Sequence, residues 1–136
     1  MTTPPHPSFQ QLLEFAFPKE LLEAFVVTQF DAEKHVREDV EIIRITFEEI
    51  NAPPTVPEEH RGKRIISKGF NRPITIQDFP LRERPCFLTI KTRRWEIEGV
   101  GTLERKLSFL PESGLKVTTD FALFLKEADR IRAGGD

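Results

Sequence analysis

The chain has 136 residues, of which 38% are hydrophobic, and a formal net charge of −2 at neutral pH. This length fits one domain with its own core, and no apolar run approaches the length of a membrane span. The single cysteine, Cys86, excludes an internal disulfide and a cysteine-based zinc site. The N-terminal MTTPPHPSFQ lacks the basic and apolar regions of a signal peptide, so we expect a cytoplasmic protein without a membrane partner.

Two short helices and a hairpin are predicted in the first third of the chain. The proline-rich residues 1–7 should be a disordered tail. Helical spacing of apolar residues predicts FQQLLEFAF and PKELLEAF as helices, with Pro18 in the first turn of the second. In DVEIIRITFEEI, alternation predicts a strand that buries Ile43, Ile45 and Phe47. VVTQF would pair with this strand in a hairpin around DAEKHVRED.

The middle of the chain is predicted to be a long connection followed by strands. NAPPTVPEEHRGKR holds three prolines and should be an exposed loop. ITIQDF predicts a short strand, FPLRERP a turn, and CFLTIKTRRWEIE the longest strand. Regular alternation on that strand would place Lys91, Arg93 and Trp95 on one face. Gly99 and Gly101 then predict a turn.

A final helix, DFALFLKEADRI, is expected to begin after a capping Thr118 or Thr119. Its apolar stripe consists of Phe121, Phe124, Leu125 and Ala128. The order of elements predicts an α+β fold, in which two short N-terminal helices and the C-terminal helix pack on a small antiparallel β-meander. One domain would span residues 8–132, and residues 133–136 would form a second disordered tail.

No catalytic or cofactor motif is present. GxGxxG, GxxxxGK[ST], GxSxG and CxxC are all missing. His6, His35 and His60 lack metal-binding spacing, and no histidine near Cys86 could activate it. Neighbouring carboxylates such as Glu48 and Glu49 point to opposite faces of a strand and cannot act together on one bond. They are expected to be solvated surface residues rather than a catalytic pair. We therefore expect no catalytic site, no metal and no cofactor.

Charge is distributed very unevenly along the chain. From Arg61 to Arg94 there are ten basic and two acidic residues, a sum of +8, so the remainder sums to −10. Arginine and lysine neutralise phosphates, and an exposed tryptophan can stack on a base. Alternatively, Trp95 belongs to the core and the arginines balance the acidic strands. The residues alone leave both interpretations open.

The segment RGKRIISKGFNRPITIQDFPLRERPCFLTIKTRRW resembles the N-terminal region of ISAon1-type insertion-sequence transposases, where a KGF…ITIQDFPIR stretch leads into an arginine-rich RRW strand. FLPESGLKVTTDFALFLKEADR is similar to the closing segment of that region, and the likeness covers residues 15–130. In the related ISL3 group a zinc ribbon has cysteine pairs here, whereas this chain has Glu96, Ile97 and Glu98 after the arginines. The resemblance implies that the metal was lost and that apolar packing replaces it.

The resemblance further implies a non-catalytic DNA-binding or accessory subunit that recognises terminal inverted repeats and positions a separately encoded DDE nuclease. The expected DNA-binding residues are Arg61, Lys63, Arg64, Lys68, Arg72, Lys91, Arg93, Arg94 and Trp95. Most would contact phosphates, and one or two arginines would read base edges. The alternative is a protein-interaction module, in which the acidic hairpin around residues 31–50 docks a basic partner or the C-terminal helix forms a homodimer. A small enzyme is a third, weaker hypothesis.

Overall fold

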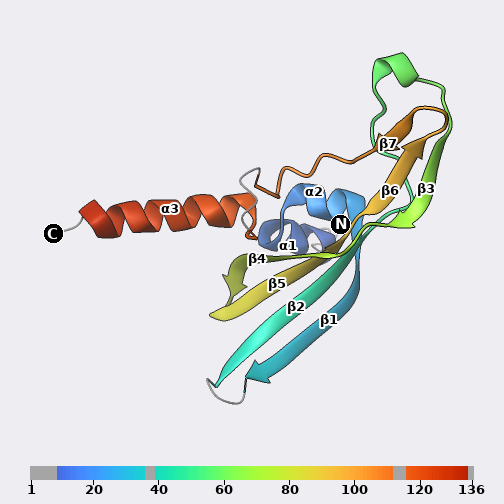
Figure 1. The fold of residues 1–136 in the computed structure, drawn as a ribbon. Coiled ribbons are helices and arrows are strands. Elements are labelled where there is room, and N and C mark those ends of the chain that lie inside the picture. The colour runs from blue at the N-terminus through green and yellow to red at the C-terminus, as the bar shows by residue number, and fades with distance from the viewer. Residues whose placement is uncertain (1–8, 36–38, 112–115, 135–136) are drawn as a thin grey trace, which may run out of the picture.

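The computed structural model describes residues 9–35, 39–111 and 116–134 and confirms the α+β class (Figure 1). The helices are α1 (Phe9–Ala16), α2 (Lys19–Ala24), the single 3-10 turn η1 (Glu58–His60) and α3 (Thr119–Gly134). The strands are β1 (Phe25–His35), β2 (Val40–Glu49), β3 (Ile65–Phe70), β4 (Ile74–Leu81), β5 (Arg84–Lys91), β6 (Arg93–Ile97) and β7 (Gly101–Leu103). The expected tail at residues 1–7 lies outside the described residues, whereas residues 133 and 134 belong to α3.

The strands form two sheets rather than one meander. Sheet A has the order β1-β2-β5-β4, and sheet B has the order β3-β6-β7. β2 and β5 are parallel, and the other neighbours are antiparallel. The parallel pair arises because the chain leaves sheet A after β2, forms β3 in sheet B, and returns to sheet A through β4.

The predicted β1–β2 hairpin is confirmed, with Phe30 opposite Ile45 and Val27 opposite Phe47. The alternation in β2 is also confirmed, because Ile43, Ile45 and Phe47 are buried. Since paired residues in neighbouring strands share a face, this register places Phe30 and Val27 on the same side of sheet A as the core.

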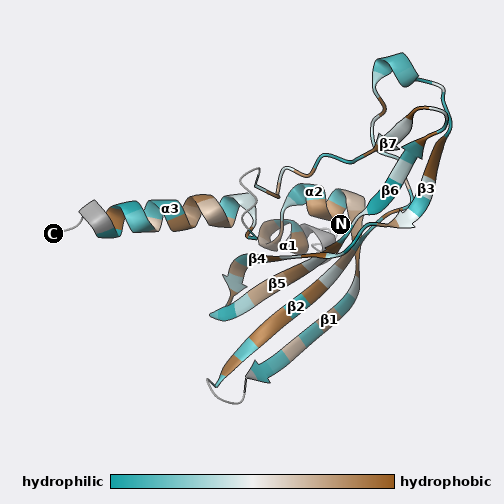
Figure 2. Ribbon diagram, in the orientation of Figure 1, coloured by the Kyte–Doolittle hydropathy of each residue, from teal (hydrophilic) through white to brown (hydrophobic). Residues whose placement is uncertain are grey.

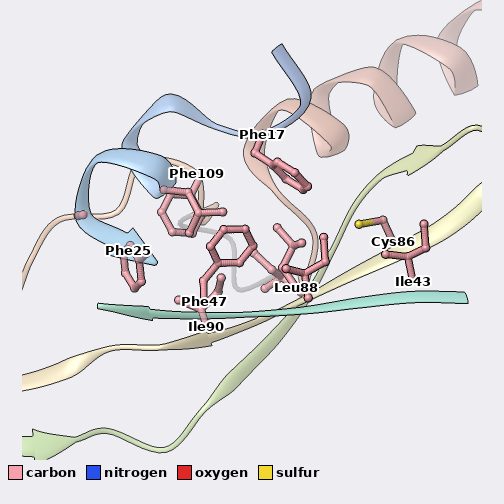
Figure 3. Close-up of a cluster of buried hydrophobic side chains, with 12 residues drawn as sticks. Phe17, Phe25, Ile43, Phe47, Cys86, Leu88, Ile90 and Phe109 are labelled. Carbon is pink, nitrogen blue, oxygen red and sulfur yellow. The ribbon is translucent and has the colours of Figure 1, made fainter. Parts of the chain in front are cut away.

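One hydrophobic cluster holds sheet A to the two N-terminal helices (Figure 3). Phe47 packs edge-on against Phe17 at 5.7 Å between ring centroids, and Phe25 packs against Phe109 at 6.2 Å. Figure 2 shows that apolar residues are concentrated on β2 and β5. None of the buried residues of this cluster comes from β3, β6 or β7, so sheet B depends on other contacts.

The C-terminal helix was predicted to pack on the sheet, but only its first turns do so. Phe121 and Phe124 contact Phe79 of β4 at 5.1 and 5.6 Å between centroids. Beyond them α3 points away from the body of the protein (Figure 1). Ile131, near its far end, is 66% exposed. The helix therefore carries an apolar stripe that the rest of the described chain does not cover.

A backbone strap fixes the direction of α3. The Gln77 N–H donates to the Lys116 carbonyl and the Thr118 N–H to the Gln77 carbonyl, both at 2.9 Å, so this segment runs along the outer edge of β4. The Thr118 hydroxyl donates to Asp78 at 2.7 Å instead of capping the helix. At the helix start, the Thr119 N–H donates to the Phe109 carbonyl at 2.9 Å.

Candidate nucleic-acid interface

Most of the basic segment forms one long, bent hairpin, residues 65–97, which we call the basic hairpin. One arm is β3 followed by β4, the other is β5 followed by β6, and the register runs from Ile65 opposite Ile97 to Leu81 opposite Arg84. The half of the hairpin near its turn, β4 with β5, belongs to sheet A, and the other half, β3 with β6, belongs to sheet B. The sequence predicted β4 and a single strand for the second arm, but not β3, whose IISKGF lacks regular alternation.

The second arm of the basic hairpin loses its alternation at Thr92. Before this residue Cys86, Leu88 and Ile90 are buried, and after it Trp95 and Ile97 are buried. The inward positions thus change from even to odd numbers. The slip is held by Asn71, whose side chain donates to the Thr92 hydroxyl at 3.1 Å and to the Arg93 carbonyl at 3.3 Å.

This slip overturns the expectation that Lys91, Arg93 and Trp95 share one face. Lys91 lies on the side of β5 that faces away from the core, and Arg94 of β6 is exposed. Arg93 and Trp95 point inward. We call the side of the hairpin that carries Lys91 and Arg94 the outward side.

Trp95 is a core residue, which settles the question that the sequence left open. Its side chain is 2% exposed, and its indole N–H donates to Oε2 of Glu49 at 2.5 Å. A buried indole with its N–H bonded inside the protein cannot stack on a base. Trp95 is therefore removed from the expected DNA-binding residues.

Glu49, the last residue of β2, is the centre of a buried polar cluster that we call the Glu49 network. Besides the Trp95 indole, its carboxylate accepts the Arg93 backbone N–H at 3.1 Å and Arg105 Nε at 3.3 Å. Its backbone carbonyl accepts Arg93 Nε at 3.0 Å. The network ties the end of sheet A to β6 and to the segment after β7. Sequence reasoning placed Glu49 on a solvated surface, although the alternation that buries Ile43, Ile45 and Phe47 puts Glu49, and not Glu48, on the same face.

Arg93 is likewise a structural residue rather than an exposed contact. Its Nη1 donates to Ser67 Oγ at 3.2 Å, and its guanidinium carbon lies 4.6 Å from the centre of the Phe70 ring. This arrangement is a cation–π contact. Together with its bonds to Glu49, it leaves little of the guanidinium available to a ligand, so Arg93 is also removed from the set.

Several other cations of the segment pair with carboxylates of the same chain. Arg84 contacts Glu41 at 2.5 Å, and Lys68 contacts Glu96 at 3.4 Å. Outside the segment, Arg44 contacts Glu33 at 3.7 Å. For these residues the interpretation that cations balance the acidic strands is correct. The same pairs consume part of the acidic charge that was expected to dock a basic partner.

Of the expected DNA-binding arginines, four remain exposed and unopposed: Arg61, Arg64, Arg72 and Arg94; Arg82, at the tip of the hairpin, is also exposed. Within residues 9–35, 39–111 and 116–134, no carboxylate makes an ion pair with any of them. Lys63, between the first two, is exposed and lies 3.0 Å from Nδ1 of His60. The four arginines and Lys63 lie just before β3, between β3 and β4, and in β6, so they surround the half of the basic hairpin that belongs to sheet B.

A shallow hollow of ≈ 810 Å³ continues the outward side onto sheet A. Its lining includes Arg72, Lys116, Thr75, Gln77 and the half-buried Phe87. Ile74 pairs with Ile90, so Lys91 follows directly after a residue that pairs with the lining of this hollow. Cations interspersed with hydroxyl and amide groups are suited to a phosphate backbone. The face of Phe87 is occupied by the Arg44 guanidinium at 5.4 Å, which leaves it poorly placed for stacking on a base.

Asp78 and Cys86 lie opposite each other on β4 and β5, on the buried side. Burial raises the pKa of Asp78 above its ordinary value, although hydrogen bonds from Thr118 and the Phe79 backbone oppose this shift. Burial and the nearby Asp78 raise the pKa of the Cys86 thiol to about 12. A thiol that stays protonated at neutral pH is a poor nucleophile.

In the part of the chain that the structure describes, no three His, Cys, Asp or Glu side chains are grouped as metal ligands. No described helix is both long and apolar enough to cross a membrane. Comparison of the chain with protein-family models, curated proteins and solved structures finds no match.

Proposed function

We propose that this chain is a non-catalytic DNA-binding subunit whose outward side of the basic hairpin holds the phosphate backbone of a duplex. The observation that carries the proposal is that four of the expected DNA-binding arginines are exposed without an acidic partner among the described residues: Arg61, Arg64, Arg72 and Arg94. Lys63, Lys91 and Lys116 supply further positive charge beside them, whereas Lys68 is paired with Glu96.

Phosphate binding suits these residues better than base readout does. Each arginine presents a planar fork that matches two phosphate oxygens, and neutralising a phosphate releases condensed counterions. Arg94 lies in β6 of sheet B, whereas Arg61, Arg64 and Arg72 lie in the connections before and after β3. No single helix or strand among the described elements concentrates them for insertion into a groove. The expected binding is therefore strongly salt-dependent and only weakly sequence-dependent.

We further propose a biological setting for this DNA binding, which we call the wider proposal. The duplex would be the terminal inverted repeat of an insertion sequence, and a DDE nuclease on a separate chain would perform the chemistry. This part rests on the similarity of the RGKR…TRRW segment to ISAon1-type transposases. It is also in keeping with Cys86 and the Glu49 network, neither of which offers a reactive group.

The test is a titration of a fluorescently labelled 30-base-pair duplex at several salt concentrations, followed by anisotropy. Wild-type protein should bind with a log–log salt slope of about −4, since four or more phosphates are neutralised. The quadruple variant Arg61→Ala, Arg64→Ala, Arg72→Ala and Arg94→Ala should lose most of this slope.

A charge-matched control removes four exposed cations elsewhere: Lys19→Ala, Lys106→Ala, Lys126→Ala and Arg130→Ala. It should keep most of the wild-type slope. Absence of wild-type binding would refute the proposal, and so would an equal loss in both quadruple variants. Comparing a terminal-repeat duplex with a shuffled duplex tests the wider proposal separately.

A further inference from the structure

The strongest unexplained feature outside the basic hairpin is the apolar stripe on α3. At 100° per residue, Phe121, Phe124, Leu125, Ala128 and Ile131 fall on one side of the helix. Phe121 is buried against Phe79, but Phe124, Leu125 and Ile131 are 55%, 41% and 66% exposed. A 16-residue helix is marginally stable in water by its own propensity. An uncovered stripe of this kind requires a partner surface.

A complementary surface exists on the body of the same chain. An apolar groove of ≈ 680 Å³ lies between α1 and the part of sheet A that the helices leave uncovered. It is lined by Leu13, Phe15, Ala16, Phe17, Leu22, Val27, Phe30, Ile45, Phe47 and Leu81, with no charged side chain. Its rim residues Phe15, Val27 and Phe30 are 93%, 50% and 60% exposed.

The helix cannot fill this groove within its own chain. The strap along β4 holds residues 116–118, Thr118 is bonded to Asp78, and Phe121 is locked against Phe79. These contacts direct α3 away from the body (Figure 1). Folding it back over the sheet would break all of them, whereas a second copy can present its groove to the helix without disturbing any.

The apolar area is sufficient for a stable dimer. Phe15, Val27 and Phe30 in the groove are matched by Phe124, Leu125 and Ile131 on the helix. Large side chains offer ~150–250 Å² each when fully exposed. Their exposed fractions in two reciprocal contacts would remove roughly 1,400 Å² of surface, which is the size of a standard protein interface.

We propose that the protein is a symmetric homodimer in which α3 of each copy packs its stripe into the apolar groove of the other copy. The arrangement buries the same two patches on both subunits, so it closes after two chains and leaves neither patch uncovered. A helix lying on the open part of a sheet also completes the layer that α1 and α2 begin. This inference is independent of the DNA-binding proposal.

Light scattering coupled to size-exclusion chromatography tests the oligomeric state at about 50 μM protein. We expect wild type at twice the 15.7 kDa chain mass. The stripe variant Leu125→Glu/Ile131→Glu and the groove variant Val27→Glu/Phe30→Glu should each be monomeric. All four positions are exposed in the single chain, so circular dichroism should show both variants folded. Leu123→Glu is the matched control, because Leu123 is 59% exposed on the opposite side of α3, and it should remain dimeric.

Mixing the two monomeric variants distinguishes this geometry from other dimers. The groove variant keeps an intact helix and the stripe variant keeps an intact groove, so together they restore one of the two contacts. A heterodimer should form in the mixture, with weaker affinity than wild type. Pairing through the β1 edges or between two α3 helices would not be restored by mixing.

Three results would overturn the proposal: a monomeric wild type at 50 μM, a Leu123→Glu variant that dissociates as fully as the stripe variant, or a mixture that stays monomeric. A monomeric wild type that sediments with phosphatidylcholine vesicles would assign the groove or the stripe to lipid instead. The DNA titration measures binding independently of dimerisation, since the stripe variant retains Arg61, Arg64, Arg72 and Arg94.

Discussion

The two sheets of this protein are stabilised in different ways. Sheet A rests on the hydrophobic cluster formed by α1, α2, β2 and β5, with Phe47, Leu88 and Ile90 fully buried. Sheet B contributes only Trp95 and Ile97 as fully buried apolar side chains, and the Glu49 network anchors it to sheet A. The basic hairpin runs through both sheets. Its β4–β5 half packs on the apolar core, and its β3–β6 half is held by the Glu49 network.

This difference shows why charge along a sequence does not translate directly into a binding surface. In sheet B the inward position next to Trp95 is filled by Arg93, because the Glu49 backbone carbonyl, the Ser67 hydroxyl and the Phe70 ring are available to receive its guanidinium. One position along, Arg94 points to solvent. Two adjacent arginines thus differ with the alternation of the strand: Arg93 is bonded inside the protein, and Arg94 is left exposed for the proposed contact with DNA.

The largest effect is expected from removing the anchor of sheet B. Glu49→Ala leaves the Trp95 indole N–H and the Arg105 guanidinium without their acceptor, at a cost of about 3–5 kcal/mol in the free energy of unfolding. Urea denaturation followed by the fluorescence of the single tryptophan measures this cost.

Glu41→Ala is the control for this substitution. It breaks the Arg84 ion pair, whose side chains are each 43% exposed, and should cost less than about 1 kcal/mol. Equal losses in the two variants would mean that sheet B does not depend on the Glu49 network.

A smaller effect is expected at the buried carboxylate of sheet A. Because burial raises the pKa of Asp78, the unfolded chain releases this proton at lower pH than the folded chain does. The contribution of Asp78 to stability is therefore complete below pH 3.8 and declines as the pH rises through the raised folded pKa.

Asp78→Asn keeps an oxygen to accept the Thr118 hydroxyl and cannot ionise. Relative to wild type, its free energy of unfolding should rise between pH 3.5 and pH 7. Denaturation midpoints at the two pH values give the comparison. A difference that is constant with pH, or that falls, would contradict the assigned shift.

The smallest effect concerns the turn at the tip of the basic hairpin. Arg82 and Glu83 have φ angles of 50° and 69°, as in a type I′ turn, where glycine is favoured at the second position. Glu83→Gly should stabilise the protein by about 0.5 kcal/mol, while Glu104→Gly, at a position without positive φ, should destabilise it. Thermal melting of both variants tests the sign, and destabilisation by Glu83→Gly would argue against this turn.

The parts of the fold that the sequence predicted are governed by local patterns. Helical spacing located α1, α2 and α3, and alternation located β2 and its buried Ile43, Ile45 and Phe47. The remaining features depend on contacts between distant segments. Asn71 sets the slip at Thr92 from the opposite arm, and Glu49 becomes buried only when Arg93, Trp95 and Arg105 converge on it. The direction of α3 depends on a strap along β4 that no local pattern encodes.

For the candidate site, composition correctly indicated where the charge lies but not which cations are available. Arg61, Arg64, Arg72 and Arg94 remain candidates because they are exposed, whereas Arg93 and Trp95 belong to the Glu49 network. The strand phase that separates these groups could not be read from RRW alone, since a strand without a slip would group Arg93 with Lys91.

The most direct test compares Arg93→Ala with Arg94→Ala in both stability and DNA binding. Arg94→Ala should leave the free energy of unfolding within about 0.5 kcal/mol of wild type and reduce the salt slope of duplex binding by about one. Arg93→Ala should lower stability by about 1–2 kcal/mol and leave the salt slope unchanged. If Arg93→Ala flattens the slope while Arg94→Ala does not, the division of the basic hairpin into an inward structural side and an outward DNA-binding side is wrong.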